Sequence, residues 1–120
     1  MSKRNIVHVE IPAADLQGTS SFYQKLFGWK IRPMPEMNYT RWEAADGSGG
    51  GFPAASADNP AGQVLIYIAS DDIEADLKNV EKLGGTVLTP KTEIPSMGWF
   101  GIFKDPTDNV IGLYTDLNPS

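Results

Sequence analysis

The sequence predicts an α+β fold in which two β-α-β-β-β modules form an incomplete barrel around a cavity. Three observations lead to this: the order of predicted elements repeats in the two halves, residues match at a constant separation between the halves, and the strands alternate in polarity. The 120-residue chain is long enough for a stable core, and it has no cysteine that could form a disulfide. We expect a single domain whose modules span about residues 5–57 and 63–117.

The first half begins with a predicted strand over residues 5–12, where apolar and polar side chains alternate. A helix over residues 17–27 follows, and it ends at Gly28, the residue type most common after a helix. Three further strands are expected, at residues 29–32, 39–45 and 50–55. Pro33 is expected to end the first of these, and the Asp- and Gly-rich segment 46–49 is typical of a hairpin turn between the other two.

The second half is predicted to repeat this order of elements. A helix is expected over residues 72–83, with Asp72 as its N-cap and Gly84-Gly85 as its end. Strands are predicted at residues 63–69, 86–89, 98–104 and 109–115. A second hairpin turn, over residues 105–108, would join the last two strands.

The two halves can be aligned at one separation. When Gly28 is matched with Gly85, 57 residues further on, Trp42 also matches Trp99 without a gap. Equivalent helix ends and equivalent aromatic residues on the third strand are what a duplicated module would show. The alignment therefore favours two copies of one structural unit.

Alternation along the strands assigns side chains to the predicted cavity. In the first strand, Val9 would face the helix while His8 and Glu10 line the cavity. The same reasoning places Tyr67 and Tyr114 of the second half on the cavity side. The cavity wall is therefore expected to combine one imidazole, one carboxylate and aromatic rings.

Several motifs stand in order on this frame: His8 with Asp15 seven positions later, Phe22-Tyr23, Leu26-Phe27-Gly28-Trp29, Asp71-Asp72-Ile73, Leu83-Gly84-Gly85, and Phe103-Lys104-Asp105-Pro106 with Asn109, Gly112 and Leu113. Together they resemble the vicinal oxygen chelate superfamily, which includes glyoxalase I, bleomycin-resistance proteins and extradiol dioxygenases. The resemblance covers nearly the whole chain and implies a glyoxalase/bleomycin-resistance-like fold. It implies less about activity, because one fold can carry many functions.

In metal-dependent members of that superfamily, the first and last strands of each half hold a divalent ion, usually through His and Glu. The resemblance places these ligand positions at His8, Pro53, Leu65 and Gly112. Of these four residues, only His8 can donate to a metal. Glu10 is two residues further along the same strand, about 6–7 Å away at the backbone, which is an unfavourable geometry for two ligands of one ion. We therefore expect no cofactor, and in particular no divalent metal.

The candidate ligand-binding residues are His8, Glu10, Trp42, Tyr67, Met97, Trp99 and Tyr114. His8 and Glu10 are also the candidate catalytic residues, because an imidazole and a carboxylate can transfer protons. Each candidate has a structural alternative: His8 and Glu10 as polar groups hydrogen-bonded within the sheet, and Trp42 and Trp99 as core residues. Met97 is placed at the cavity mouth by analogy with the family alone.

The expected function is binding of a small organic molecule in the cavity, similar to the bleomycin-resistance branch. Metal-dependent glyoxalase or dioxygenase activity is not expected. The alternative is a lyase, isomerase or dioxygenase-like enzyme that uses His8 and Glu10 as acid and base, or that holds an atypical metal. A third hypothesis is an accessory domain of a larger assembly, since an open sheet edge can pair with another chain.

Charge and hydropathy limit the partners. The net charge of −5, with scattered Lys and Arg, argues against nucleic acid. No apolar run approaches the ~20 residues that span a bilayer, so we expect no membrane partner and a cytoplasmic location. The family likeness implies a homodimer.

Overall fold

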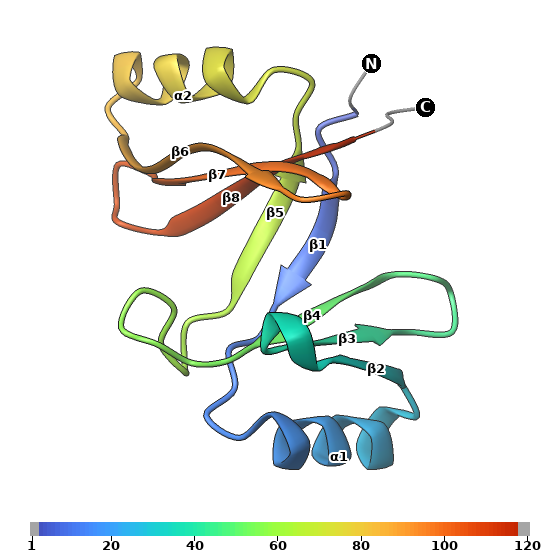
Figure 1. The fold of residues 1–120 in the computed structure, drawn as a ribbon. Coiled ribbons are helices and arrows are strands. Elements are labelled where there is room, and N and C mark those ends of the chain that lie inside the picture. Colours follow the sequence, from blue (N-terminus) through green and yellow to red (C-terminus); the bar gives the residue numbers. More distant parts are fainter. Residues whose placement is uncertain (1–2, 118–120) are drawn as a thin grey trace. The chain divides into compact units, whose positions relative to one another are not determined.

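The computed structural model describes residues 3–117 (Figure 1). Its elements are β1 (Ile6–Glu10), α1 (Leu16–Phe27), β2 (Lys30–Met34), the 3₁₀ turn η1 (Pro35–Met37), β3 (Tyr39–Glu43), β4 (Gly49–Pro53), β5 (Leu65–Ala69), α2 (Ile73–Lys82), β6 (Thr86–Ile94), β7 (Gly98–Lys104) and β8 (Val110–Asp116). The described chain divides into an N-terminal unit, residues 8–65, and a C-terminal unit, residues 3–7 with 66–117. The order of elements confirms the predicted α+β class with two β-α-β-β-β modules. Closure of the two sheets around a common cavity stays a prediction.

The N-terminal unit has the strand order β2-β3-β4-β1, in which β1 is parallel to β4 and the other neighbours are antiparallel. Helix α1 begins after Asp15, whose side chain accepts a hydrogen bond from the Gly18 N–H at 3.1 Å. It ends at Gly28, whose φ of 74° is the left-handed conformation that glycine adopts without strain. These local signals set the helix length, and they match the sequence prediction to within one residue.

An aromatic core fills the space between α1 and its sheet. Phe52 is fully buried, and Trp42 and Ala13 are buried beside it. Trp42 stacks on Trp29 with 4.0 Å between ring centroids, and Tyr23 of α1 stacks on both Trp29 and Phe52, at 5.2 and 5.5 Å. The Nε1 of Trp42 is buried without a hydrogen-bond partner among residues 3–117, so ring packing alone holds this indole in place.

The C-terminal unit has the strand order β5-β8-β7-β6, with β5 parallel to β8. Asp72 is the N-cap of α2, as predicted, and accepts a hydrogen bond from the Ala75 N–H at 3.1 Å. Ile73 and Leu77 of this helix pack against Leu113 of β8 and form the core. Neither α1 nor α2 is long and apolar enough to cross a membrane.

Both units pair their first strand with their last in the same way. Glu10 lies opposite Gly51 in the N-terminal unit, and Tyr67 lies opposite Gly112 in the C-terminal unit. Glu10 and Tyr67 are 57 positions apart, whereas Gly51 and Gly112 are 61 apart. The modules therefore repeat, but the separation grows by four residues between the helix and the last strand.

This change of separation corrects the alignment of Trp42 with Trp99. Trp42 pairs with Gly50, and the corresponding pair in the C-terminal unit is Phe103 with Ile111. The counterpart of Trp42 is therefore Phe103. The extra residues lie in the longer β6–β7 hairpin, which the sequence prediction treated as a shorter strand followed by a loop.

Two strands extend further than the sequence predicts. β2 continues through Pro33 to Met34, because it is the edge strand of its sheet and a proline there removes no interior ladder bond. β6 continues to Ile94, and its register against β7 shifts on both sides of Thr89. Such irregularities let a strand continue past a local break in its pattern.

An ion pair ties residue 4 to α2 within the C-terminal unit. The Arg4 guanidinium donates to both carboxylate oxygens of Asp76, at 2.5 and 2.8 Å, and the Ser70 hydroxyl donates to the same carboxylate at 2.6 Å. Hydrogen bonding from Arg4, and then from Ser70, lowers the pKa of Asp76 against the opposing effect of its partial burial. The folded state therefore binds this proton less readily than the unfolded chain does.

The core assignment makes a first prediction. Phe52→Ala should lower the free energy of unfolding by about 3–5 kcal/mol, because it removes a fully buried ring. Phe22→Ala, at a side chain that is 60% exposed on α1, is the matched control and should cost less than about 1 kcal/mol. Urea unfolding measures both values. Equal losses in the two variants would contradict the assignment.

The Asp76 carboxylate makes a second prediction. Because its folded-state pKa is depressed, its stabilising contribution is present above the unfolded-state pKa of about 4 and is lost as the pH falls through the folded-state value. Asp76→Asn should therefore be less stable than the wild type at pH 7, with the difference shrinking toward pH 2. Glu81→Gln, on the exposed side of α2, serves as the control in the same urea titrations. A difference that does not vary with pH would count against this role of the ion pair.

Candidate functional site

Three polar side chains of the N-terminal unit form one hydrogen-bonded group, named here the polar trio: His8, Glu10 and Tyr39. The His8 Nε2 lies 2.7 Å from the Tyr39 hydroxyl oxygen, and the hydroxyl donates to Glu10 Oε2 at 2.9 Å. The His8 Nε2 and Glu10 Oε2 are 3.4 Å apart. The side chains of His8 and Glu10 are 26% and 14% exposed, so the trio is partly screened from water yet reachable by a ligand.

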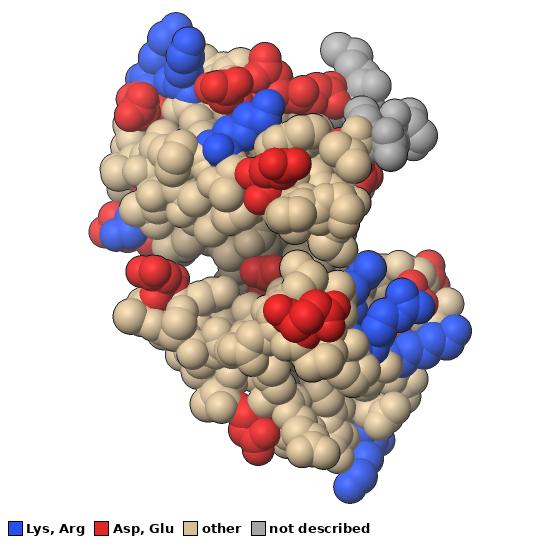
Figure 2. All heavy atoms as spheres, viewed as in Figure 1, with Lys and Arg blue, Asp and Glu red and all other residues tan. Residues whose placement is uncertain are grey.

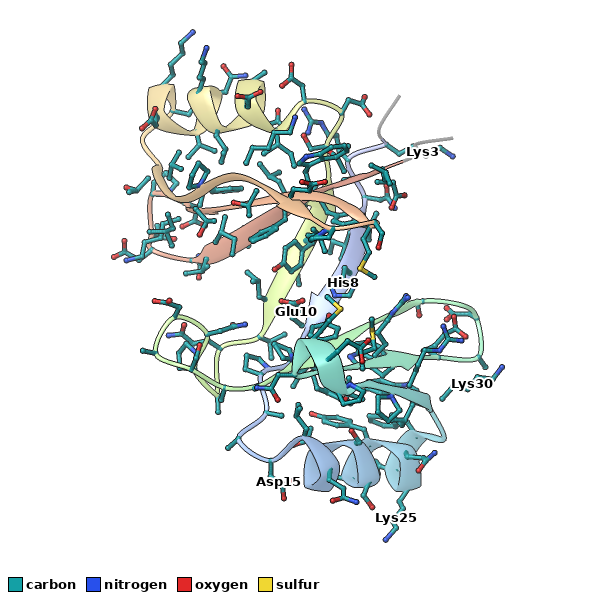
Figure 3. All side chains as sticks on the ribbon, viewed as in Figure 1. Lys3, His8, Glu10, Asp15, Lys25 and Lys30 are labelled. Carbon is teal, nitrogen blue, oxygen red and sulfur yellow. The ribbon has the colours of Figure 1, made fainter. Side chains whose placement is uncertain are left out.

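Strand register explains why these residues meet. His8 and Glu10 are two apart on β1 and therefore project to the same side of the sheet (Figure 3). This side is named the site face, and it is the face opposite α1. Glu10 lies opposite Gly51 on β4, and Gly51 lies opposite Arg41 on β3, so all three belong to the site face. Tyr39, two residues before Arg41, is on the same face and points back toward β1.

Gly51 is the residue that lets Tyr39 reach Glu10. A Cβ at position 51 would collide with the hydroxyl and ring carbons of Tyr39. The tyrosine ring therefore lies directly over the glycine backbone, on the strand between β3 and β1. Any larger residue at position 51 would push the ring away and open the hydrogen bond to Glu10.

The directions of the hydrogen bonds in the trio indicate which nitrogen of His8 carries a proton. The hydroxyl of Tyr39 has a single proton, and it is donated to the Glu10 carboxylate. The short contact to His8 then requires that Nε2 carry a proton and donate it to the tyrosine oxygen. The order of donation is imidazole to hydroxyl to carboxylate, which is an arrangement that can hold a proton or pass it along.

The donor set does not fit the divalent-metal site of the metal-dependent family members. Within residues 3–117, no group of three or more His, Asp or Glu side chains is placed to hold a metal ion. The strand register shows that the counterpart of Gly112 is Gly51, which corrects the expected ligand position at Pro53. Neither glycine offers a side-chain donor, and tyrosine rings occupy the space above both: Tyr39 above Gly51 and Tyr67 above Gly112.

Two of the expected ligand contacts lie in the core instead. Trp42 is only 8% exposed and packs under α1, on the face opposite the polar trio. Trp99 packs against the core formed by Ile73, Leu77 and Leu113, and the Lys91 ammonium lies 5.2 Å from its ring centroid. Strand alternation thus turns both indoles toward the helices, which agrees with their structural alternative as core residues, and a ligand contact of either indole stays a prediction.

Tyr67 and Tyr114 lie on the face of the C-terminal unit's strands that is opposite α2, and Met97 lies in the turn between β6 and β7. Tyr67 lies opposite Gly112, and Tyr114 lies opposite Phe100. The Tyr114 hydroxyl donates to the backbone oxygen of Met97 at 3.2 Å, so the structure brings these two predicted residues together. Whether they contact a ligand stays a prediction.

Tyr39 was missing from the sequence prediction of the site. The alternation of side chains along β3 could have identified it. Because Trp42 lies in the core, Tyr39 and Arg41 must project to the opposite face. Sequence alone leaves Trp42 open between the core and the cavity wall, so this parity does not single out Tyr39 before the structure is known. The adjacent glycines of β4 were a further signal, because a glycine inside a strand often marks the close approach of another group.

Comparison with known proteins identifies the family of this chain. Residues 5–113 match the family model of the Glyoxalase/Bleomycin resistance protein/Dioxygenase superfamily. The chain is 28% identical over 122 aligned residues to the protein CFP32 of Mycobacterium bovis, covering 88% of this chain and 43% of that protein. It is 27% identical to a glyoxylase-like domain-containing protein of Didymella fabae, covering 89% and 90% of the two chains. The chain thus spans less than half the length of its mycobacterial relative.

Solved structures share the fold at low sequence identity. A glyoxalase/bleomycin resistance protein/dioxygenase superfamily member from Vibrio splendidus superposes with a TM-score of 0.68 at 14% identity, covering 91% of this chain and 97% of that one. Such a similarity establishes the glyoxalase/bleomycin-resistance-like fold that the sequence predicted.

The position of Gly51 makes a third prediction. Gly51→Ala should displace the Tyr39 ring and break its hydrogen bonds to Glu10 and His8, because the added methyl group occupies the place of the hydroxyl. The chain has a single histidine, so the nitrogen resonances of His8 in ¹⁵N NMR report this loss without overlap. Tyr39→Phe should change the same resonances in the same way.

A double variant provides the control for that experiment. Combining Gly51→Ala with Tyr39→Ala removes the ring with which the methyl group collides, so the methyl should then cost little further stability. If Gly51→Ala leaves the His8 resonances unchanged, or if the double variant is as strained as the single one, the proposed packing of Tyr39 over Gly51 is wrong.

Proposed function

The chain belongs to the Glyoxalase/Bleomycin resistance protein/Dioxygenase superfamily, and we propose that it binds a small organic molecule on the site face. The polar trio supplies the hydrogen-bonding contacts. The single observation that carries this proposal is the contact of His8, Tyr39 and Glu10 on one face of the sheet, with hydrogen-bonding side chains only partly exposed. Small-molecule sites contain a small number of polar groups at defined positions, and the trio is such a set.

The chemistry of the donors supports binding without a divalent ion. The trio offers one imidazole nitrogen and one carboxylate, and the imidazole Nε2 is already engaged with a hydroxyl. Catalytic zinc sites use three protein ligands, and the other positions that the resemblance and the strand register assign to ligands hold Gly51, Leu65 and Gly112, none of which has a donor side chain. We therefore place the protein among family members that recognise their ligand through side chains alone.

A second candidate function is metal-independent acid–base catalysis, and the hydrogen-bond relay favours it. An imidazole N–H, a hydroxyl and a carboxylate in sequence can protonate or deprotonate a bound substrate while the charge is shared along the chain of groups. The reaction class would be an isomerisation or an elimination that needs a proton transfer. Turnover of an identified ligand distinguishes this function from simple binding.

The homodimer expected from the family likeness belongs to the same proposal. It rests on that likeness alone, since the structure contains one chain. Light scattering combined with size-exclusion chromatography measures the mass in solution. A mass of one chain at micromolar concentration would remove the dimer from the proposal.

The proposed function makes a fourth prediction, read out at His8. A library of organic acids, amines and aromatic metabolites is titrated into the full chain, while the His8 ring resonances are followed by NMR. A ligand of the site face should shift these resonances in a saturable way, and excess EDTA should leave its affinity unchanged. His8→Ala should keep the fold and weaken the binding of that compound at least about tenfold, as loss of a hydrogen bond to a charged partner would.

Two results would contradict the proposal. One is a compound that binds only after zinc, nickel or manganese is added, with the ion in stoichiometric amount. The other is binding that shifts resonances elsewhere in the chain and leaves those of His8 unmoved. Asp58→Ala, in an exposed loop of the same unit, is the control variant and should bind as the wild type does.

A further inference from the structure

We propose that Arg41 and Arg32 form an anion subsite on the site face, so that the ligand is a small molecule with a carboxylate or phosphate at one end. The inference rests on the proposed function, because it places the anionic end beside the polar trio. It adds a ligand class that neither the family match nor the trio specifies.

The strand register aligns the two arginines with the trio. Glu10 on β1, Gly51 on β4, Arg41 on β3 and Arg32 on β2 are consecutive partners across the sheet. Partners across a sheet project to the same face, so both guanidinium groups belong to the site face. Figure 2 shows Lys and Arg side chains gathered on this part of the N-terminal unit, over the end of the sheet formed by β2 and β3.

The charge pattern is unfavourable without an anion. Arg32 and Arg41 are directly opposite each other, and like charges in that arrangement repel. Neither side chain forms an ion pair or hydrogen bond within residues 3–117, and both are exposed. In the neighbouring row, by contrast, Lys30 lies opposite Glu43, so opposite charges face each other there. The arginine pair is thus a like-charged cross-strand pair, in which neither guanidinium has a carboxylate as its direct partner on the neighbouring strand.

A small anion would compensate this row. A guanidinium group presents a planar set of N–H donors that matches the two oxygens of a carboxylate or phosphate. The chain as a whole carries a net charge of −5, which disfavours large polyanions and leaves a small, singly attached anionic group as the better fit. Carboxylate and phosphate share this chemistry, and direct titration separates them.

The spacing sets the length of the ligand. Neighbouring strands are about 4.8 Å apart, so the backbone of Arg41 lies about 10 Å from that of Glu10, and the backbone of Arg32 about 15 Å. Gly51, between β1 and β3, adds no side chain to this path, although the Tyr39 ring lies above it. A ligand held at both places would have its anionic group several bonds from the part that contacts His8 and Glu10.

The test has two independent arms, both on the full chain labelled with ¹⁵N. In the first, inorganic phosphate and acetate are titrated separately, and the arginine Nε–H resonances are followed. We expect saturable shifts at Arg41 and Arg32 in the millimolar range, weakened by added sodium chloride because the contact is electrostatic. The anion that saturates at the lower concentration identifies the preferred group.

Variants make this arm decisive. Arg41→Gln and Arg32→Gln should each weaken binding of the preferred anion at least about tenfold, because paired guanidinium donors are lost. Lys25→Gln, on α1, removes the same charge from the opposite side of the unit and should change the affinity less than about twofold. Shifts that stay linear to 50 mM, or equal effects of all three variants, would overturn the anion subsite.

The second arm is the His8-detected library described under the proposed function, repeated on Arg41→Gln. A compound that shifts His8 and loses at least about tenfold affinity in this variant supports the two-part site. A compound that shifts His8 but binds the variant equally well overturns the anion subsite and leaves the proposed function standing. If phosphate or acetate saturates the arginines while no compound shifts His8, the subsite stands and the proposed function of the trio fails.

Discussion

Tyr39 reaches Glu10 because the residue between them, on β4, is a glycine. A side chain at position 51 would fill the space that the tyrosine ring occupies, and the hydroxyl could not contact the carboxylate and the imidazole together. The contact of the Tyr39 hydroxyl with both partners follows from this close approach, whereas strand parity sets the face on which the three side chains meet. The missing Cβ at position 51 therefore decides whether the trio can form.

Side chains alternate between the two faces of this sheet, so core residues and the proposed ligand-binding residues lie on opposite faces. Residues of one parity, such as Trp42 and Phe52, pack beneath α1 and form an aromatic core. Residues of the other parity, including Glu10 and Arg41, project to the site face. Because each strand contributes to both faces, the core can be rigid while the opposite face keeps polar and charged groups accessible.

The C-terminal unit repeats the packing of a tyrosine ring over a glycine. Tyr67 lies over Gly112 as Tyr39 lies over Gly51, so in both modules an aromatic ring takes the space above the glycine of the last strand. The resemblance to metal-dependent family members, together with the strand register, assigns two of the expected ligand positions to these glycines. A metal ligand at either position would need both a donor side chain and a displacement of the overlying ring.

The sequence by itself determined the order of the elements, the helix starts and the face of β1. Asp15 and Asp72 marked the helix starts, and the alternation of β1 placed His8 and Glu10 together, because capping and alternation depend only on neighbouring residues. Only the tertiary structure decided which residue from another strand completes the site. Pairing register depends on loop lengths and on contacts between distant segments, and it brought Tyr39 to the trio and made Phe103 the counterpart of Trp42.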